Sequence, residues 1–99
     1  PDALSDLQIL SIEEVSTSYY LRMRVDDQPG VLADIARILA DRSISIGSMI
    51  QQPARIGGAD IIFLTHEAVE GNVNQAIEHI EALPFVRSKV TRLRMENLT

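Results

Sequence analysis

The sequence contains no cysteine and no tryptophan, and its 99 residues include only two tyrosines and two phenylalanines. Without cysteine the chain can form neither a disulfide framework nor a thiolate metal site. Its longest aliphatic and aromatic run, residues 61–64, is far too short to span a bilayer. Nine basic against fourteen acidic residues give a net charge of −5, which disfavours non-specific binding to nucleic acid. We therefore expect one globular domain with neither a membrane nor a nucleic-acid partner.

The chain also lacks the motifs of catalysis. Its two histidines, His66 and His79, fall in different predicted elements, and no Ser-His-acid arrangement or GxGxxG loop is present. Residues 66–70 have the outline of a zinc-protease motif, but the fifth residue is Glu70 instead of histidine. The sequence therefore predicts no catalytic residue, no metal ligand and no cofactor site in this chain.

Residues 1–17 differ from the rest, because they hold four acids and no base and show no sustained period of two or 3.6. We interpret them as a linker or docking strap from a parent catalytic domain, and residues 18–99 as the folded domain. The chain opens with Pro1 instead of methionine, which suggests a piece of a longer protein. No charged and then apolar leader precedes the domain, so we expect a cytoplasmic location.

Hydrophobic periodicity divides the remainder into strands and helices. Alternation predicts strands at residues 19–25, 43–52, 59–66 and 86–95. Helical spacing of apolar residues predicts helices over 31–42 and from 71 to 83, where Pro84 stops the second one. The order predicts an α+β, ferredoxin-like βαββαβ sandwich, in which two helices cover one face of a four-stranded antiparallel sheet.

The same patterns assign side chains to the two faces of the sheet. In the second strand, alternation places Ile44, Ile46 and Ile50 on one face. The first and last strands carry arginines at positions expected to point outward, as a solvated or salt-bridged face: Arg22, Arg24, Arg92 and Arg94. Ile62 and Leu64 fall on the open face of a central strand, where an antiparallel sheet is normally wet, and they indicate a covering partner.

The stretch from Asp27 to Leu32, with the sequence Asp-Gln-Pro-Gly-Val-Leu, joins the first strand to the first helix. Pro29 suits a helix start, and Gly30 lets another group approach the backbone closely. The N–H groups of Gly30, Val31 and Leu32 would then point out of a helix N-terminus, which favours a carboxylate. Asp27 could cap the helix or accept from an ammonium. Together these groups could hold both charged ends of a free amino acid, although a plain strand-to-helix turn with an Asp cap explains the same residues.

In this context the sequence resembles the ACT domains, which are small amino-acid-sensing regulatory modules. The residues that carry the resemblance are 24–26, the loop 27–32 and Ile44-Ser45-Ile46, and the likeness covers residues 19–95. A narrower resemblance is to the C-terminal ACT domain of bacterial homoserine dehydrogenases. It rests on residues 12–15, 19–22, 35–40, 62–66, 74–77 and 82–84.

The resemblance implies an effector site and a parent enzyme. Asp27 takes the place of the polar residue that binds the effector's amino group, and Gly30, Val31 and Leu32 supply backbone groups, with Gln28 beside them. Ser45 stands where amino-acid-binding members often have asparagine, and a hydroxyl offers one donor instead of two. Such enzymes reduce aspartate semialdehyde to homoserine with NAD(P)H, in the biosynthesis of threonine and methionine. Threonine is the implied effector, and a side-by-side homodimer is the implied binding unit.

Two other functions remain open. The first is a structural dimerisation domain that has lost its ligand, which Ser45 and the apolar open face favour. The second is an RNA-recognition module, which has the same order of elements but needs stacking aromatic residues on its first and third strands. Tyr20 could supply one, whereas the third strand offers Ile62 and Leu64.

Overall fold

The computed structural model describes residues 16–55 and 57–95. Its strands are β1 (Ser16–Val25), β2 (Ile46–Pro53), β3 (Ala59–Thr65), β4 (Ala68–Val69) and β5 (Thr91–Met95), and its helices are α2 (Val31–Asp41) and α3 (Glu70–Glu81). Ser16 and Thr17 belong to β1, so this strand begins earlier than its periodicity predicts. The rest of the predicted linker lies outside the described residues.

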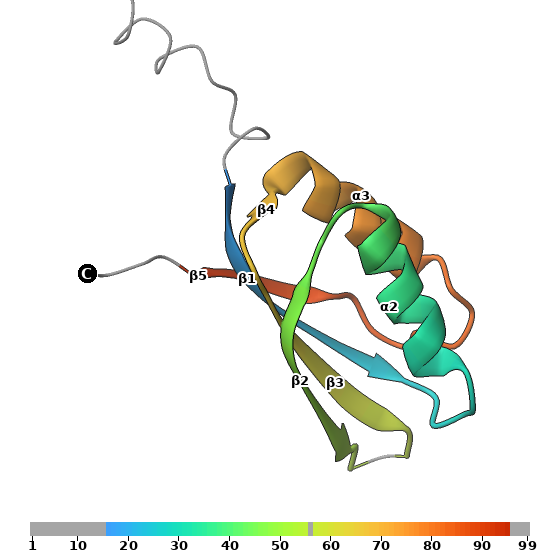
Figure 1. Cartoon of the computed structure of the whole chain (residues 1–99). Helices are drawn as coiled ribbons and strands as arrows, with labels where there is room; N and C mark the ends of the chain where they lie inside the picture. The colour runs from blue at the N-terminus through green and yellow to red at the C-terminus, as the bar shows by residue number, and fades with distance from the viewer. Residues whose placement is uncertain (1–15, 56, 96–99) are drawn as a thin grey trace, which may run out of the picture.

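The strands form one antiparallel sheet, and both helices lie on one of its faces (Figure 1). β1 pairs with β3 on one side and with β5 on the other, and β2 continues the sheet beyond β3. The short β4, which periodicity does not predict, pairs with Ser16 and Thr17 at the start of β1. The predicted ferredoxin-like α+β sandwich is therefore confirmed.

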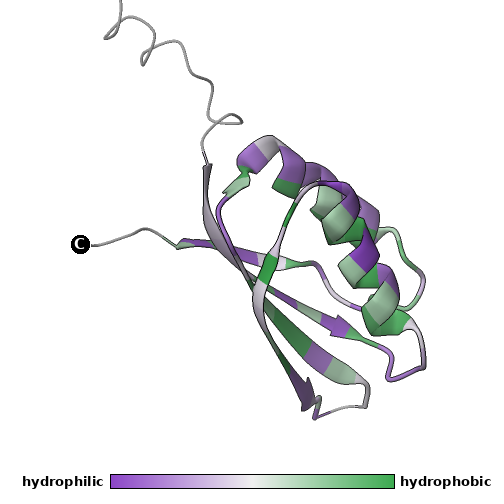
Figure 2. Cartoon of the chain, viewed as in Figure 1, coloured by the Kyte–Doolittle hydropathy of each residue, from purple (hydrophilic) through white to green (hydrophobic). Residues whose placement is uncertain are grey.

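The hydrophobic core lies between the sheet and the helices. Every second residue of β3, and of β1 from Tyr19 onward, is buried there, as the alternation predicts. Each helix packs one apolar face against these residues, and Figure 2 shows hydrophobic as well as hydrophilic residues along both helices. The largest fully buried side chains are those of Tyr19, Leu21, Met23, Val25, Ile35, Leu39, Ile61, Phe63, Val73 and Ile80.

In β2 the prediction for Ile50 was wrong, because the strand carries a bulge near Gly47. Ile46 pairs with the buried Thr65, but after the register shift Ile50 pairs with Ile62 on the open face. One extra residue in a strand reverses which face every later side chain occupies. The strand also starts at Ile46, because Ser43 has a φ of 61° and does not continue an extended chain.

The four arginines do not share one face, contrary to the prediction. Arg22 and Arg24 lie on the open face, where both contact Asp60, at 3.3 and 3.5 Å. In contrast, Arg92 pairs with Leu21 and Arg94 with Tyr19, which places both on the helix side of β5. There Arg92 contacts Asn74, and Arg94 lies 2.5 Å from the Glu70 carboxylate of α3.

The open face of the sheet carries a group of apolar side chains beside the Arg22, Arg24 and Asp60 cluster. Ile62 and Leu64 lie on it as predicted, opposite Ser48, Ile50, Tyr20 and Arg22 of the neighbouring strands. Leu93, which pairs with Tyr20, is 56% exposed, and Met95 is 43% exposed. Among the described residues, no helix is long and apolar enough to cross a membrane.

Two glycines in the turn between β2 and β3 offer a matched test of the packing at the end of β1. Gly57 and Gly58 both have positive φ, but a Cβ on Gly58 would overlap the carbonyl oxygen of Val25, whereas one on Gly57 meets open space. Gly57→Ala should cost about 1 kcal/mol of unfolding free energy through backbone strain alone. Gly58→Ala should cost about 1 to 3 kcal/mol more, because the backbone must move. Urea unfolding of both variants measures the difference, and equal losses would contradict the close packing.

Candidate functional site

The loop between β1 and α2 is a series of tight turns. The Gln28 N–H donates to the Asp26 carbonyl at 3.0 Å, and the Val31 N–H donates to the Gln28 carbonyl at 3.4 Å. Gly30 is the N-cap of α2 with a φ of 87°, a conformation that favours glycine. Pro29 therefore precedes the cap instead of opening the helix. The Val31 N–H is already engaged, so it is not free for a ligand as the sequence prediction had it.

Asp27 does not cap the helix, since no side chain bonds to the N-terminus of α2. Asp27 is exposed and lines a cavity of about 260 Å³ together with Gln51, Gln52 and Pro53 at the end of β2. The structure thus adds the end of β2 to the surroundings of the predicted loop. The carboxylate of Asp27 remains available to accept hydrogen bonds from a cation.

A second segment of the chain anchors the loop. The Asp26 N–H donates to the Phe85 carbonyl at 2.9 Å, and the Arg87 N–H donates to the Arg24 carbonyl at 2.8 Å. The Arg87 guanidinium also donates to both carboxylate oxygens of Asp26, at 2.7 and 2.9 Å. These hydrogen bonds from Arg87 lower the pKa of Asp26 below its ordinary value. Sequence reasoning missed this pair, because the two residues are distant in the chain and follow no motif.

Ser45 lies at the other end of α2. It is exposed, directly precedes β2, and borders a cavity of about 600 Å³ that is also lined by Ala36 and Ala40 of α2. Its neighbour Ile44 donates its N–H to the Leu39 carbonyl at 2.9 Å, which fixes the chain to the last turns of the helix.

The predicted site residues therefore form two groups in one chain. Asp27, Gln28 and Gly30 gather at the N-terminus of α2, whereas Ser45 follows its C-terminus. The 11 residues of α2 span about 16 Å. A single amino acid cannot contact both groups within one chain.

His66 is exposed just after β3 and lies beside Ser45, although the sequence prediction did not include it among the site residues. The His66 N–H donates to the Ser45 carbonyl at 2.9 Å. Its ring lies against Gly47: a Cβ built on Gly47 would be 3.5 Å from Cε1 and 3.6 Å from Nε2. Antiparallel pairing of β2 with β3 was the signal in the sequence that could have placed this histidine next to Ser45.

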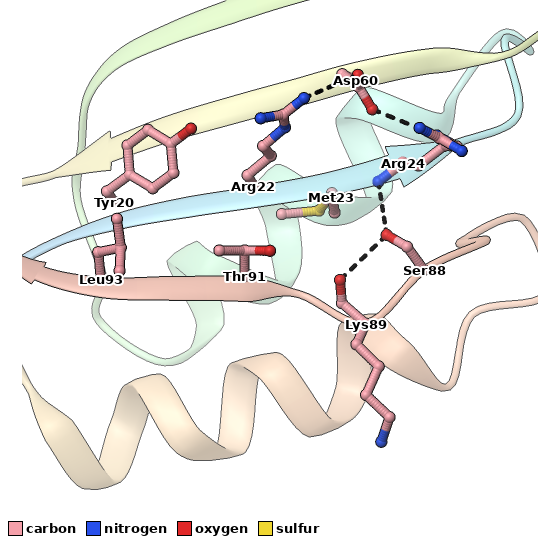
Figure 3. Close-up of a pocket in the computed structure, with 9 residues that line it drawn as sticks. All are labelled: Tyr20, Arg22, Met23, Arg24, Asp60, Ser88, Lys89, Thr91 and Leu93. Carbon is pink, nitrogen blue, oxygen red and sulfur yellow. Dashed lines mark hydrogen bonds and ion pairs between the residues drawn. The ribbon is translucent and has the colours of Figure 1, made fainter. Parts of the chain in front are cut away.

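A third cavity, of about 480 Å³, opens on the exposed face of the sheet (Figure 3). Arg22 and Arg24 reach Asp60 along one side of β1, and the Arg24 N–H donates to Ser88 Oγ at 3.0 Å on the other side. The cavity contains none of the predicted site residues. Among the described residues, no group of three His, Asp or Glu side chains is placed to hold a metal ion.

Comparison with known proteins gives a consistent result. A family model described as the ACT domain matches residues 19–85. The chain is 59% identical to a homoserine dehydrogenase of Methylobacillus glycogenes and 46% identical to one of Pseudomonas aeruginosa, over 100% and 99% of its own length. It covers 24% and 23% of those proteins, so it spans about a quarter of the relatives that it matches.

Solved structures agree. A homoserine dehydrogenase from Thiobacillus denitrificans superposes with a TM-score of 0.81 at 56% identity, over 91% of this chain and 20% of that one. The ACT domain of a GTP pyrophosphokinase from Chlorobium tepidum superposes with a TM-score of 0.64 at 14% identity, over 80% of this chain and 100% of that one. The second likeness shows the fold alone.

The Asp26–Arg87 pair predicts how the loop responds to pH and to mutation. Arg87→Gln should raise the pKa of Asp26 toward its ordinary value and speed amide exchange at Gln28 and Val31. In the wild type the pair's stabilisation is present above the ordinary carboxyl pKa and is lost as pH falls through the lowered one. A carbon-detected NMR titration of Asp26 measures the shift. Arg37→Gln, which removes the exposed Arg37–Asp34 pair on α2, is the control. An unchanged Asp26 pKa in Arg87→Gln would contradict the anchoring.

Proposed function

The chain belongs to the ACT domain family, and we propose from this premise that it is the amino-acid-binding regulatory domain of a homoserine dehydrogenase. The identity to homoserine dehydrogenases over nearly the whole chain supports this proposal. In that setting the remainder of the polypeptide binds NAD(P) and reduces aspartate semialdehyde. The domain adjusts that activity in response to threonine.

The N-terminus of α2 supports binding of a zwitterion. The first backbone bond of the helix runs from the Asp34 N–H to the Gly30 carbonyl at 3.0 Å, so the N–H groups of Leu32 and Ala33 precede the helical ladder. These groups and the helix dipole favour a carboxylate. Asp27, exposed on the same loop, accepts from the ammonium group of the effector.

A side-by-side dimer joins the two groups of site residues. β2 is an edge strand without a charged residue, whereas the opposite edge strand, β5, carries Arg92 and Arg94. Two copies of β2, paired antiparallel about a two-fold axis at mid-strand, set Ile46 of one copy beside Pro53 of the other. Because Asp27 lies beside Gln51 to Pro53, Ser45 of one copy then approaches Asp27 of the other. Each effector contacts both chains.

Regulation then follows from differential affinity. Threonine at the dimer junction stabilises the packing of the two domains in which both halves of the site meet. The resulting shift in the enzyme's activity can be no larger than the ratio of threonine affinities for the two packings.

A structural dimerisation domain without a ligand is the second candidate. The observation that favours it is the pair of apolar side chains, Leu93 and Met95, that stay exposed on the open face of the single chain. Such a domain would still pair through β2 but would not respond to amino acids.

Calorimetry separates the two functions. Asp27→Asn should weaken threonine binding by about tenfold to a hundredfold, because an ammonium loses a charged acceptor. Asp34→Asn, at another exposed acid on α2, should leave binding unchanged. Both variants should remain dimers by analytical ultracentrifugation.

The regulatory proposal fails if the folded wild-type dimer gives no heat with threonine, homoserine, serine, isoleucine or methionine at millimolar concentration. A dimer that is silent toward all five supports the structural alternative.

A further inference from the structure

We propose that His66 contacts the side-chain hydroxyl of the effector and so selects a hydroxylated amino acid over its apolar isostere. This inference rests on the proposed function, since it assigns a residue to the same site. It concerns a side chain that neither the motif of the loop nor the pattern of the second strand indicates.

The backbone fixes His66 in register with Ser45. The Ser45 carbonyl accepts the His66 N–H at 2.9 Å, immediately beyond the pairing of Ile46 with Thr65. The two residues thus enter the site as one unit, carried by adjacent strands of the same hairpin. A movement of β2 relative to β3 would have to break this bond before it could separate them.

Gly47 determines where the imidazole lies. A Cβ at this position would be 3.5 Å from Cε1 and 3.6 Å from Nε2 of His66, and 3.1 Å from the Leu64 carbonyl oxygen. The ring therefore rests across the bulge of β2, at the edge where a second chain would pair. His66 is exposed, and within the described part of the chain its ring nitrogens make no hydrogen bond to another side chain.

The other histidine is arranged differently. Nε2 of His79, on α3, lies 2.7 Å from the Arg42 guanidinium, so His79 already has a partner within the chain. The sequence contains only these two histidines. His79 therefore serves as an internal control for any change at His66.

The chemistry of the site leaves one group of the effector without a contact. Asp27 and the N-terminus of α2 take the ammonium and carboxylate ends, and they do so for any amino acid. A neutral imidazole offers one donor and one acceptor, and a serine hydroxyl offers the same pair on a shorter arm. In the antiparallel dimer, His66 and Ser45 of one copy face the loop of the other, where the effector side chain points. A site with such groups discriminates against a ligand that lacks the hydroxyl.

Threonine and valine provide the test, because they differ by a hydroxyl in place of a methyl group. The wild-type chain should bind threonine at least about tenfold more tightly than valine. His66→Ala should reduce this preference to near unity by weakening threonine binding while leaving valine binding unchanged. His66→Gln, which keeps an amide near the position of Nε2, should retain part of it. His79→Ala should retain all of it.

Two further measurements locate the contact. In NMR spectra of the wild type, the His66 imidazole resonances should shift on addition of threonine and those of His79 should not. Mixed dimers of Asp27→Asn and His66→Ala chains should recover threonine binding at one of the two sites, because one junction then has both residues intact.

Several results would overturn the inference. If His66→Ala weakens the binding of threonine and valine equally, His66 contacts the ammonium or carboxylate shared by all amino acids, or it serves only the structure of the site. An unchanged affinity for threonine would exclude His66 from the site. Failure of the mixed dimers to recover binding would mean that Asp27 and His66 of one site come from the same chain, against the proposed junction. If the wild type binds no amino acid at all, the proposed function itself fails, and this inference fails with it.

Discussion

The pairing of β1 with both β3 and β5 is the constraint on which the rest of the molecule depends. β1 lies inside the sheet, so one set of its side chains must fill the core while the other forms the open face. The loop that follows it starts where β1 stops pairing, at Val25 and Asp26. Hydrogen bonds of Asp26 to the Phe85 carbonyl and to the Arg87 guanidinium tie the loop to the segment that follows α3. The candidate site is thus built on the end of the most constrained strand.

Much of this fold could be predicted from the sequence, and the failures have physical causes. β1, β3 and the helices each bury one face, so the spacing of their apolar residues was sufficient to predict these elements and their buried sides. The bulge at Gly47 adds one residue to β2, so Ile50 lies on the opposite face from Ile46. No local pattern in the sequence indicates this extra residue. Arg92 and Arg94 were assigned to the wrong face because β5 is exposed throughout and its register depends on pairing with β1.

For the candidate site, the sequence predicted local chemistry better than geometry. Asp27 and Gly30 lie in the loop as expected, but the turn engages the Val31 N–H, and Ser45 lies a helix length away. A linear motif does not record which strand ends meet in space. The position of His66 beside Ser45 follows from the pairing of β2 with β3, whereas Gln51 comes near Asp27 because β3 also pairs with the end of β1. The sequence predicts an antiparallel sheet but not the register of these strands.

The composition of β2 has a consequence for the solubility of the isolated chain. Its eight residues include no lysine, arginine, aspartate or glutamate, and Pro53 interrupts its backbone donors only at the last position. A neutral, unpaired strand edge is a template for open-ended growth into aggregates. Pairing of two β2 strands about a two-fold axis would cover both of these neutral edges at once and leave only the β5 edges, which carry Arg92 and Arg94. The proposed dimer would therefore protect the chain against aggregation, independently of whether an effector is bound.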